Sequence, residues 1–421
     1  MELLAKLKIA LFFNLPSGGA KRAIYEWVRR AFNWSIDVYT MSTADHEFLD
    51  LRPWVQNYNV SEFTAHRLFH HPFGRLNQGQ RWRDLGSLSR INESIASKIN
   101  QGGYDLAFIQ PCIYTYIPEL VSYLRIPSVY YLHEPLETMA WSRINRPYLG
   151  STESFREKID KVDPLIGLYQ RRLRNIRLQG LHSVTCVLAN SRFTQQQTLK
   201  SFGVEAEVSY LGVDTESFQP SSQIERDYAV ISVGEMAPRK GFDFLIESLG
   251  YIPVLQRPYL KLVCNRIDLQ EKKYLEELAF EKGVRLIIFE RLNTEELAKA
   301  YKSSLFCVYA PVEEPFGLVP LEAMACGLPV VGVNEGGVAE TVIPGVTGLL
   351  VERSPKEFAR AVWSLLENPG LSAILSRKAR VQASQNWSWE RSVDQLQGQF
   401  ERIIGNKYPN GKNMGKVNLN G

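Results

Sequence analysis

Two glutamates, Glu314 and Glu322, flank a Pro-Phe-Gly turn in the run EEPFGLVPLEAMACGLPVVG. A carboxylate on the turn and another one helical turn into the following helix can both face a ligand over the N-terminus of that helix. Carboxylates accept hydrogen bonds from hydroxyls, and a helix N-terminus attracts phosphate. The spacing therefore predicts a site for a ligand that carries both hydroxyls and phosphate.

A basic pair, Arg239 and Lys240, stands in the segment GEMAPRKGFD. A strand is expected to end at Gly234 just before it, which places the pair at the carboxyl edge of a sheet, where open α/β sheets bind ligands. Adjacent guanidinium and ammonium groups suit a diphosphate that must be neutralised as it leaves. A solvated pair before a helix is the alternative, and the phosphate-attracting helix start at Phe316–Leu318 favours the diphosphate.

Two features of the first half could complete such a site. The glycines Gly18 and Gly19 follow the first apolar run, and their backbone can approach a ligand closely and donate to phosphate. The alternative is a tight turn; the pattern is not GxGxxG, so a dinucleotide is not favoured. His133 ends the apolar run VYYLH at the same expected sheet edge. A histidine there can equally be a structural residue.

Short apolar runs alternate with helical patterns through both halves of the chain. This alternation is typical of parallel, doubly wound sheets. The sequence therefore predicts an α/β protein with two Rossmann-like domains. The strands expected in the first domain are 8–14, 35–40, 106–110, 128–133 and 183–189, and those of the second lie in VSYLG, YAVISVG, YLKLVCN, VRLIIFE, LFCVYAP, PVVGV and LLV.

The boundary between the two domains is predicted near Gly203–Glu207. The first domain is then expected to span 1–206 and the second 207–387. A helical pattern over 388–404 follows the last sheet element, and we expect this helix to pack back on the first domain. The remaining 405–421 is polar and rich in Gly and Asn, which predicts a disordered tail.

Composition narrows the class of protein. The formal charge of +4, from 49 basic and 45 acidic residues among 421, is too mild to indicate nucleic acid binding. The apolar start around Ile9–Phe13 is short and leads into a glycine turn, so we interpret it as a strand and not as a signal peptide. No apolar run is long enough to cross a membrane. Five cysteines without CxxC spacing indicate reduced thiols and favour the cytoplasm.

The motifs EPFGLVPLEAMACGLPVV and GEMAPRKGFD together resemble the retaining GT-B glycosyltransferases of family 4, which carry the glycosyl transferase group 1 domain. The resemblance is dense over about Val208–Asn386 and looser before it. It implies a nucleoside-diphosphate sugar in a cleft between two facing Rossmann-like domains. The second domain would hold the nucleotide, and the first would face the acceptor. No cofactor besides this donor substrate is implied.

The resemblance also implies a role for each matching residue. Arg239 and Lys240 would contact the donor diphosphate, Glu314 the sugar hydroxyls and Glu322 the ribose hydroxyls. His133 would face the sugar and the acceptor and act near the anomeric centre, in a front-face reaction whose leaving phosphate takes the acceptor proton. The implied catalytic set is His133, Glu314, Arg239 and Lys240, and the donor-binding set adds Gly18, Gly19, Phe316, Gly317, Leu318, Val319 and Glu322.

Some further segments allow two interpretations. Asn190–Ser191 resembles the strand-end motif of the family but suits a helix N-cap as well, and Glu340 in GGVAETV could approach the sugar. Cys264–Arg266 replaces a glycine-rich loop that relatives often have. No metal is expected, because the sequence has no D-x-D pair and its His66, His70 and His71 lack a matching ligand.

Two basic clusters remain, and either could meet an anionic acceptor or the membrane, or be a solvated helix face. One lies in 67–90 with Phe69, Phe73 and Trp82 among its arginines, and the other is in 171–177. We expect a retaining, metal-independent hexosyltransferase in the cytoplasm that acts on a glycan or lipid-linked acceptor, with peripheral membrane contact left open. A sugar-nucleotide epimerase or hydrolase of the same fold, and a catalytically silent scaffold subunit, are the alternatives.

Overall fold

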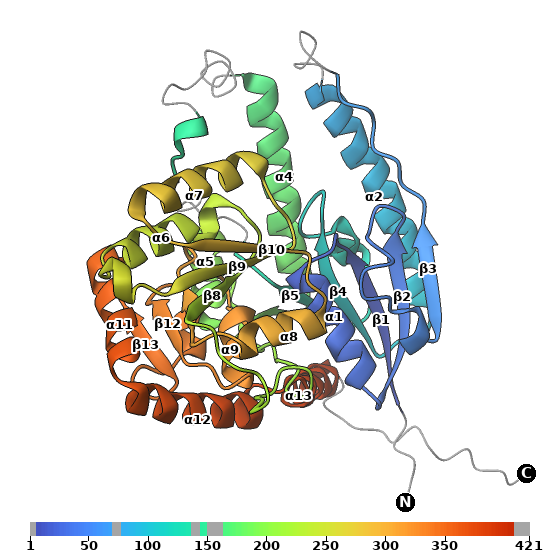
Figure 1. The fold of residues 1–421 in the computed structure, drawn as a ribbon. Helices are drawn as coiled ribbons and strands as arrows, with labels where there is room; N and C mark the ends of the chain where they lie inside the picture. The colour runs from blue at the N-terminus through green and yellow to red at the C-terminus, as the bar shows by residue number, and fades with distance from the viewer. Residues whose placement is uncertain (1–5, 70–76, 136–143, 150–162, 408–421) are drawn as a thin grey trace, which may run out of the picture.

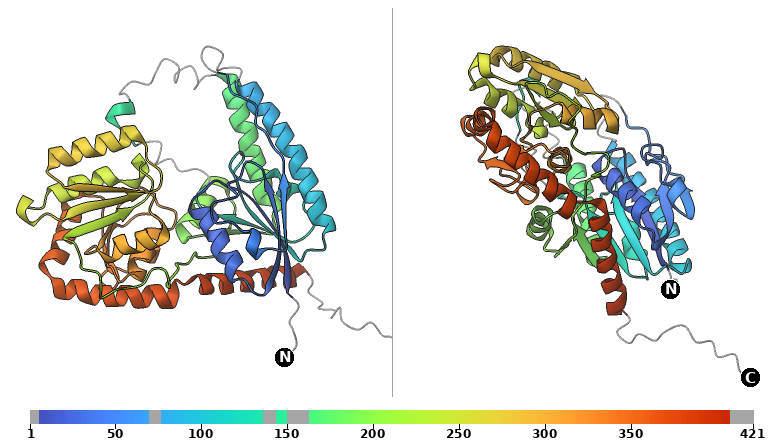
Figure 2. Two further views of the ribbon diagram at one scale, coloured as in Figure 1. Left: turned by 45° about the vertical axis from the view of Figure 1, so that its right-hand side comes forward. Right: turned by 60° about the horizontal axis from the view of Figure 1, so that its bottom comes forward.

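The structure is a computed structural model that describes residues 6–69, 77–135, 144–149 and 163–407. Two parallel sheets with helices on their faces stand side by side (Figure 1), and the last two helices, Pro369–Asn386 and Trp389–Lys407, run beneath the second and the first domain respectively (Figure 2). The predicted α/β class with two Rossmann-like domains is confirmed.

The first sheet has seven strands in the order β3-β2-β1-β4-β5-β6-β7. Alternate residues of its interior strand β1 enter different cores: Ile9 and Leu11 pack on one face, and Ala10 and Phe12 on the other. This two-sided burial is why the strand reads as a continuous apolar run. The strands are β1 (Leu7–Asn14), β2 (Trp34–Met41), β3 (Asn57–Ser61), β4 (Leu106–Cys112), β5 (Ser128–Leu132), β6 (Cys186–Ala189) and β7 (Glu207–Val208).

The helices of the first domain cover both faces of this sheet (Figure 1). Ser183 ends a helix, so the strand predicted from that residue begins only at Cys186. The helices are α1 (Gly19–Arg30), α2 (Asn77–Gln101), α4 (Pro164–Ser183) and α5 (Arg192–Phe202), with short 3-10 turns at Arg52–Trp54, Glu119–Tyr123 and Pro147–Leu149.

The second sheet has six strands in the order β10-β9-β8-β11-β12-β13. Its strands are β8 (Ala229–Val233), β9 (Tyr259–Cys264), β10 (Leu286–Glu290), β11 (Cys307–Tyr309), β12 (Val330–Val333) and β13 (Gly348–Val351). Its helices are α6 (Phe242–Gly250), α7 (Leu269–Lys282), α8 (Thr294–Lys302), α9 (Leu318–Ala325), α10 (Val338–Thr341), α11 (Pro355–Glu367) and α12 (Pro369–Asn386), with 3-10 turns η6 (Pro238–Lys240) and Val254–Gln256.

The boundary between the domains differs from the prediction in one element. Strand β7 pairs with β6, with Leu188 opposite Glu207, and so belongs to the first sheet. The segment VSYLG was assigned to the second sheet because it begins a new apolar run. The first sheet therefore extends to Val208, past the boundary predicted at residue 206, and the second sheet starts at Ala229.

The last helix, α13 (Trp389–Lys407), lies against the first domain (Figure 2). Trp27 of α1 donates a hydrogen bond from Nε1 to Ser392 Oγ at 2.9 Å, and the Trp34 ring packs on Phe400. The helix continues three residues beyond the predicted end at 404, through the start of the predicted tail. Residues 408–421 of that tail lie outside the described residues.

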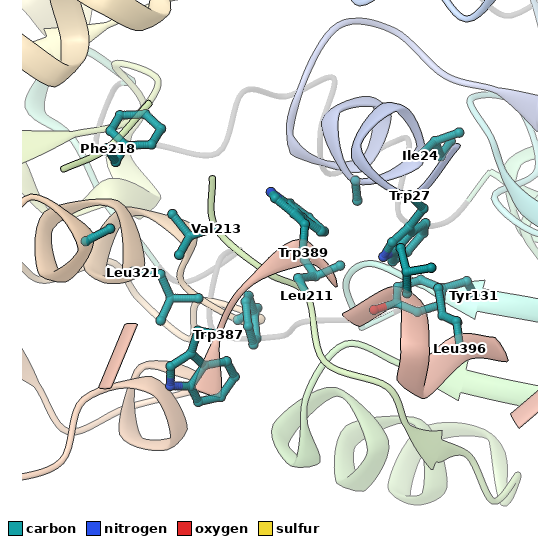
Figure 3. Packing of buried hydrophobic residues seen from close by; sticks show 14 of the residues in the cluster. Ile24, Trp27, Tyr131, Leu211, Val213, Phe218, Leu321, Trp387, Trp389 and Leu396 are labelled. Atoms are coloured by element: carbon teal, nitrogen blue, oxygen red, sulfur yellow. The ribbon is translucent and has the colours of Figure 1, made fainter. Parts of the chain in front are cut away.

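One apolar cluster joins the two domains (Figure 3). Trp389 lies between Trp27 of the first domain and the segment with Leu211 and Val213, and Leu321 of α9 belongs to the same cluster. A Cβ added at Gly212 would come within 2.6 Å of the Trp389 backbone, so the linking segment and α13 pack closely. Shared burial of this kind fixes how the two sheet edges face each other.

Candidate functional site

The basic pair and the first glutamate of the opening motif meet at one edge of the second sheet. Lys240 ends the 3-10 turn η6, and its Nζ lies 2.7 Å from Glu314 Oε2 in the segment after β11. Both side chains are mostly buried. Arg239 pairs with Glu235 through its Nη2 at 2.5 Å. A mostly buried ammonium and carboxylate in contact form a strongly polar edge at which a charged ligand could be bound.

Close backbone packing fixes this edge. Gly241 has a φ of 65°, and a Cβ there would lie 2.1 Å from Ala310 O. The amide of Val312 donates to Arg239 O at 2.8 Å, so the turn with the cations is tied to the segment that carries the glutamate. Only glycine satisfies both the left-handed conformation and this approach. The relative position of Lys240 and Glu314 is therefore built into the backbone.

The glycine pair after β12 supports the glutamate from the other side. A Cβ on Gly336 would lie 2.3 Å from Glu314 O, and one on Gly337 would lie 2.4 Å from Pro315 O. The amide of Gly337 donates to Glu314 O at 2.7 Å. Gly336 and Gly337 therefore allow the loop after β12 to lie directly against the backbone of the turn that carries Glu314.

The first glycine loop lies across the domain interface from the start of α9. A Cβ on Gly19 would be 3.8 Å from Leu318 Cδ1, whereas one on Gly18 would meet nothing within 4 Å. Gly317, at a φ of 98°, precedes the first turn of α9. The structure thus brings together Gly18, Gly19, Gly317 and Leu318, all predicted from the sequence to meet the donor.

Phe316, another predicted donor contact, has its side chain in the core. The ring is 2% exposed and packs against the rings of Tyr210 and Trp387. The Phe316 ring packs into the apolar cluster that joins the two domains. Any contact of Phe316 with a ligand must come from its backbone.

Glu322 is buried in α9 and accepts hydrogen bonds on both of its carboxylate oxygens. Arg22 of α1 donates from Nη1 to Oε1 at 2.8 Å, and Tyr301 of α8 donates to Oε2 at 2.9 Å. Burial raises the pKa of the Glu322 carboxyl, and the charge of Arg22 opposes this shift. Neither Arg22 nor Tyr301 was predicted, because no local sequence signal connects residues this far apart.

His133 lies just after β5 and is held by hydrogen bonds on its ring and its backbone. Its Nε2 lies 2.8 Å from Gln110 Oε1, and Asn190 donates from Nδ2 to His133 O at 2.6 Å. The rings of Trp27 and Tyr131 are close by. Burial lowers the pKa of His133 to about 3, so the imidazole is neutral at pH 7. The Gln110 oxygen can only accept, which places the proton on Nε2 and leaves Nδ1 as an acceptor.

The lowered pKa of His133 predicts a pH dependence of stability. An unfolded histidine has a pKa of about 6.5, so between about pH 6.5 and 3 the unfolded chain binds a proton that the folded one does not. The free energy of unfolding should therefore fall as the pH drops below about 6.5. We expect the free energy of unfolding, measured with urea, to fall between pH 7.5 and pH 5.5 by about 1.4 kcal/mol more in the wild type than in His133→Gln. Equal losses in both proteins would contradict this assignment.

Glu134, next to His133, was given no role from the sequence. Burial raises the pKa of its carboxyl, Arg239 and Lys240 of the second domain lower it, and Glu314 raises it again. These interactions place Glu134 of the first domain near the charged edge of the second. The site thus contains acidic and basic groups from both domains.

Two contacts tie the domains together beside this site. Ser191, the N-cap of α5, donates from Oγ to Pro315 O at 2.5 Å. Glu340 of α10 accepts from the amides of Arg192 and Phe193 at 2.9 Å each, and so caps the same helix from the other domain. The N-cap interpretation of Ser191 is confirmed, and the Glu340 carboxylate has structural partners at this domain contact.

Residues 77–90 of the first basic cluster lie on α2, beside the second cluster on α4 (Figures 1 and 2). The guanidinium of Arg172 stacks over the Trp82 ring, with its Cζ 4.6 Å from the centroid. Trp82, Leu165 and Leu168 are exposed there. His66, from the histidine group considered for a metal, pairs with Asp84 at 2.7 Å, and its companions His70 and His71 lie outside the described residues. Phe73 and Arg75 of the first basic cluster lie outside them as well.

Metal-binding clusters and membrane-spanning helices are absent from the described part of the chain. No group of three or more His, Cys, Asp or Glu residues there could hold a metal ion. No described helix is long and apolar enough to cross a membrane. All five cysteines are unpaired, as the sequence predicted; four are buried and Cys186 is half-buried.

Two Rossmann-like domains whose sheet edges supply residues to a shared site define the GT-B fold. Solved structures agree over nearly the whole chain. Sucrose-phosphate synthase from Thermosynechococcus elongatus matches with a TM-score of 0.70 and 21% identity over 95% of this chain and 100% of that one. Anabaena HepE in complex with UDP-glucose matches with a TM-score of 0.68 and 21% identity over 94% and 100%.

Sequence comparisons match part of the chain to known glycosyltransferases. Residues 213–382 match the glycosyl transferases group 1 model. It is 32% identical over 241 residues to the GDP-mannose-dependent alpha-(1-6)-phosphatidylinositol monomannoside mannosyltransferase of Mycolicibacterium smegmatis, covering 50% of this chain and 62% of that protein. It is 31% identical over 232 residues to the D-inositol 3-phosphate glycosyltransferase of Geodermatophilus obscurus, covering 50% and 51%. The chain thus spans about half the length of the curated relatives it matches.

Proposed function

We propose that this protein transfers a hexose, with retention of anomeric configuration, from a nucleoside-diphosphate sugar to a hydroxyl of a glycan or lipid-linked acceptor. The observation that carries the proposal is the contact of Lys240 with Glu314 beside Arg239, at the edge that faces the glycine loop of the first domain. Cations suit a diphosphate and a carboxylate suits sugar hydroxyls. A nucleotide sugar requires both in one place.

The proposed reaction needs no nucleophile from the protein. The bond between the anomeric carbon and the phosphate oxygen breaks, the acceptor oxygen bonds to the same face of that carbon, and the acceptor proton passes to the leaving phosphate. Arg239 and Lys240 neutralise the charge that develops on the diphosphate, the task that a divalent metal performs in other transferases. We therefore propose metal-independent transfer.

The neutral His133 and Glu314 would position the sugar in this reaction. Nδ1 of His133 can accept a hydrogen bond from a hydroxyl, because its Nε2 proton is directed to Gln110. Glu314 can accept from a second sugar hydroxyl while it keeps its contact with Lys240. Fixed hydrogen bonds of this kind hold the anomeric carbon near the acceptor oxygen.

Names among the similar proteins indicate the class of donor. A matched relative is named for GDP-mannose and a structural neighbour binds UDP-glucose, so we propose a nucleoside-diphosphate hexose without naming its base. The arginines and exposed apolar side chains on α2 and α4 support an anionic acceptor or a peripheral membrane contact. The five free thiols support a reducing compartment, and we propose the cytoplasm.

Two measurements test the proposed function. A thermal-shift screen with UDP-, GDP- and ADP-hexoses should find at least one donor that raises the melting temperature. That donor should then turn over slowly alone and faster with a glycan or glycolipid acceptor mixture, and NMR of the product should show the donor's anomeric configuration. Fast turnover without acceptor would indicate a hydrolase or an epimerase. Binding without any turnover would indicate the scaffold alternative.

A further inference from the structure

We infer that Arg22 makes the site select nucleoside diphosphates over nucleosides. The Arg22 guanidinium must leave Glu322 when a ribose binds there, and a phosphate of the same ligand then becomes its new anionic partner. This inference rests on the proposed function and on the contact with the ribose hydroxyls that the family resemblance implies for Glu322. It assigns a role to a residue of the first domain that neither the sequence motifs nor the family match singled out.

The carboxylate of Glu322 is the starting point. Its Oε2 accepts from Tyr301, whose ring is fully buried behind it. Its Oε1 accepts from Arg22, whose side chain is 31% exposed against 7% for Glu322. The accessible side of the carboxylate is therefore the side that Arg22 covers. Ribose hydroxyls would have to approach through the space that the Arg22 guanidinium occupies, so the two donors compete for the same side of the carboxylate.

Displacing Arg22 is costly unless its charge finds another partner. A charged hydrogen bond between mostly buried groups contributes more than a neutral one, and breaking it strands the charge that remains. A bound nucleoside would satisfy Glu322 but offer nothing to the guanidinium. It would therefore bind only with the loss of the Arg22–Glu322 pair.

A bound diphosphate would give the Arg22 guanidinium a new anionic partner and so compensate for the broken pair with Glu322. Arg22 lies in the first turn of α1, and its amide donates to Gly18 O at 3.0 Å. Its long side chain thus starts beside the Gly18–Gly19 loop, the part of the first domain predicted to meet phosphate. A guanidinium binds phosphate through two parallel hydrogen bonds. Donor binding would then exchange one anionic partner of Arg22 for another.

The simpler alternative is that Arg22 only ties the two domains together. In that case its removal would loosen the site and change the affinities for nucleoside and nucleoside diphosphate in the same direction. If Arg22 competes with the ribose for Glu322 and then binds the phosphate, its removal should strengthen nucleoside binding and weaken nucleoside diphosphate binding. The two explanations therefore differ in a measurable ratio of dissociation constants.

The experiment compares wild type with Arg22→Met by isothermal titration with UDP, GDP and ADP and with uridine, guanosine and adenosine. For the base that the protein accepts, we expect the nucleoside to bind about tenfold more tightly to Arg22→Met and the nucleoside diphosphate about tenfold more weakly. Arg22→Lys, which keeps the charge but not the two-pronged geometry, should fall between these proteins.

Arg29→Met is the matched control. Arg29 is on the same helix, is 27% exposed and bonds Asp214 at 2.9 Å, but that carboxylate is not predicted to meet the donor. Its removal should leave the ratio of the two constants unchanged. If Arg22→Met changes the affinities for nucleoside and nucleoside diphosphate in the same direction, or leaves the nucleoside diphosphate affinity unchanged, this inference is wrong and the proposed function stands. Failure of all three nucleoside diphosphates to bind wild type would overturn the proposed function and this inference with it.

Discussion

Replacing Lys240 with methionine is expected to lower kcat for sugar transfer by about 10²- to 10³-fold. Methionine keeps the apolar stem but removes the charge that would neutralise the leaving diphosphate, and the loss of one such preorganised donor typically costs about 3 to 4 kcal/mol in the transition state. The measurement is steady-state transfer with the donor that the thermal-shift screen identifies.

The same substitution leaves the Glu314 carboxylate without its partner at 2.7 Å, so it should also lower stability. The double variant Lys240→Met/Glu314→Gln removes both charges and should recover stability without recovering activity. Lys282→Met, which removes a surface ammonium paired with Glu281, is the control for loss of a lysine charge. Wild-type kcat in Lys240→Met would exclude Lys240 from the diphosphate site.

Glu314→Gln is expected to weaken the binding of the nucleotide sugar while sparing that of the free nucleoside diphosphate. The carboxylate is proposed to hold sugar hydroxyls, and a charged acceptor bonds a hydroxyl more strongly than an amide does. We expect kcat/KM to fall by about 10²-fold, because the lost hydrogen bonds also position the anomeric carbon. Titration of the variant with both ligands measures the difference directly.

Lys240→Met is the useful comparison for this variant, since it should weaken both ligands. Glutamine retains an oxygen that can accept from Lys240, which keeps the ammonium paired and the fold intact. If Glu314→Gln weakens the free nucleoside diphosphate as much as the nucleotide sugar, Glu314 contacts phosphate-side groups and its assignment to the sugar is wrong.

Most strands could be predicted because both faces of each parallel sheet are buried. Strand β1 is apolar at nearly every position for that reason, as is β4. Strand β3, Asn57–Ser61, was missed: it lies at the sheet edge, is mostly exposed and carries a polar sequence. Strand β7 was assigned to the wrong sheet, since two residues contain no information on which neighbour they pair with.

The site was predictable where a local motif holds it. The turn around Glu314 and the pair Arg239–Lys240 are short segments with their own backbone geometry, and the structure brings them together. The partners of Glu322 were not predictable, because Arg22 and Tyr301 come from other elements and approach only in the folded chain. The sequence pattern also did not indicate that the Phe316 ring is buried in the apolar core between the domains.

The neutral state of His133 is a result that only the folded structure could provide. Its pKa depends on burial among rings and strands that are distant in sequence. A histidine that stays neutral at physiological pH can orient a hydroxyl but cannot supply a proton as imidazolium. This agrees with a reaction in which the leaving phosphate accepts the acceptor proton.

The most direct test of the donor site is equilibrium binding of UDP, GDP and ADP to wild type and to Arg239→Met/Lys240→Met at one ionic strength. We expect at least one of the three to bind wild type and to bind the double variant at least about 100-fold more weakly, with unchanged far-UV circular dichroism. Equal affinity in the two proteins, or no binding to wild type, would contradict the assignment of this interdomain site to a nucleoside-diphosphate sugar.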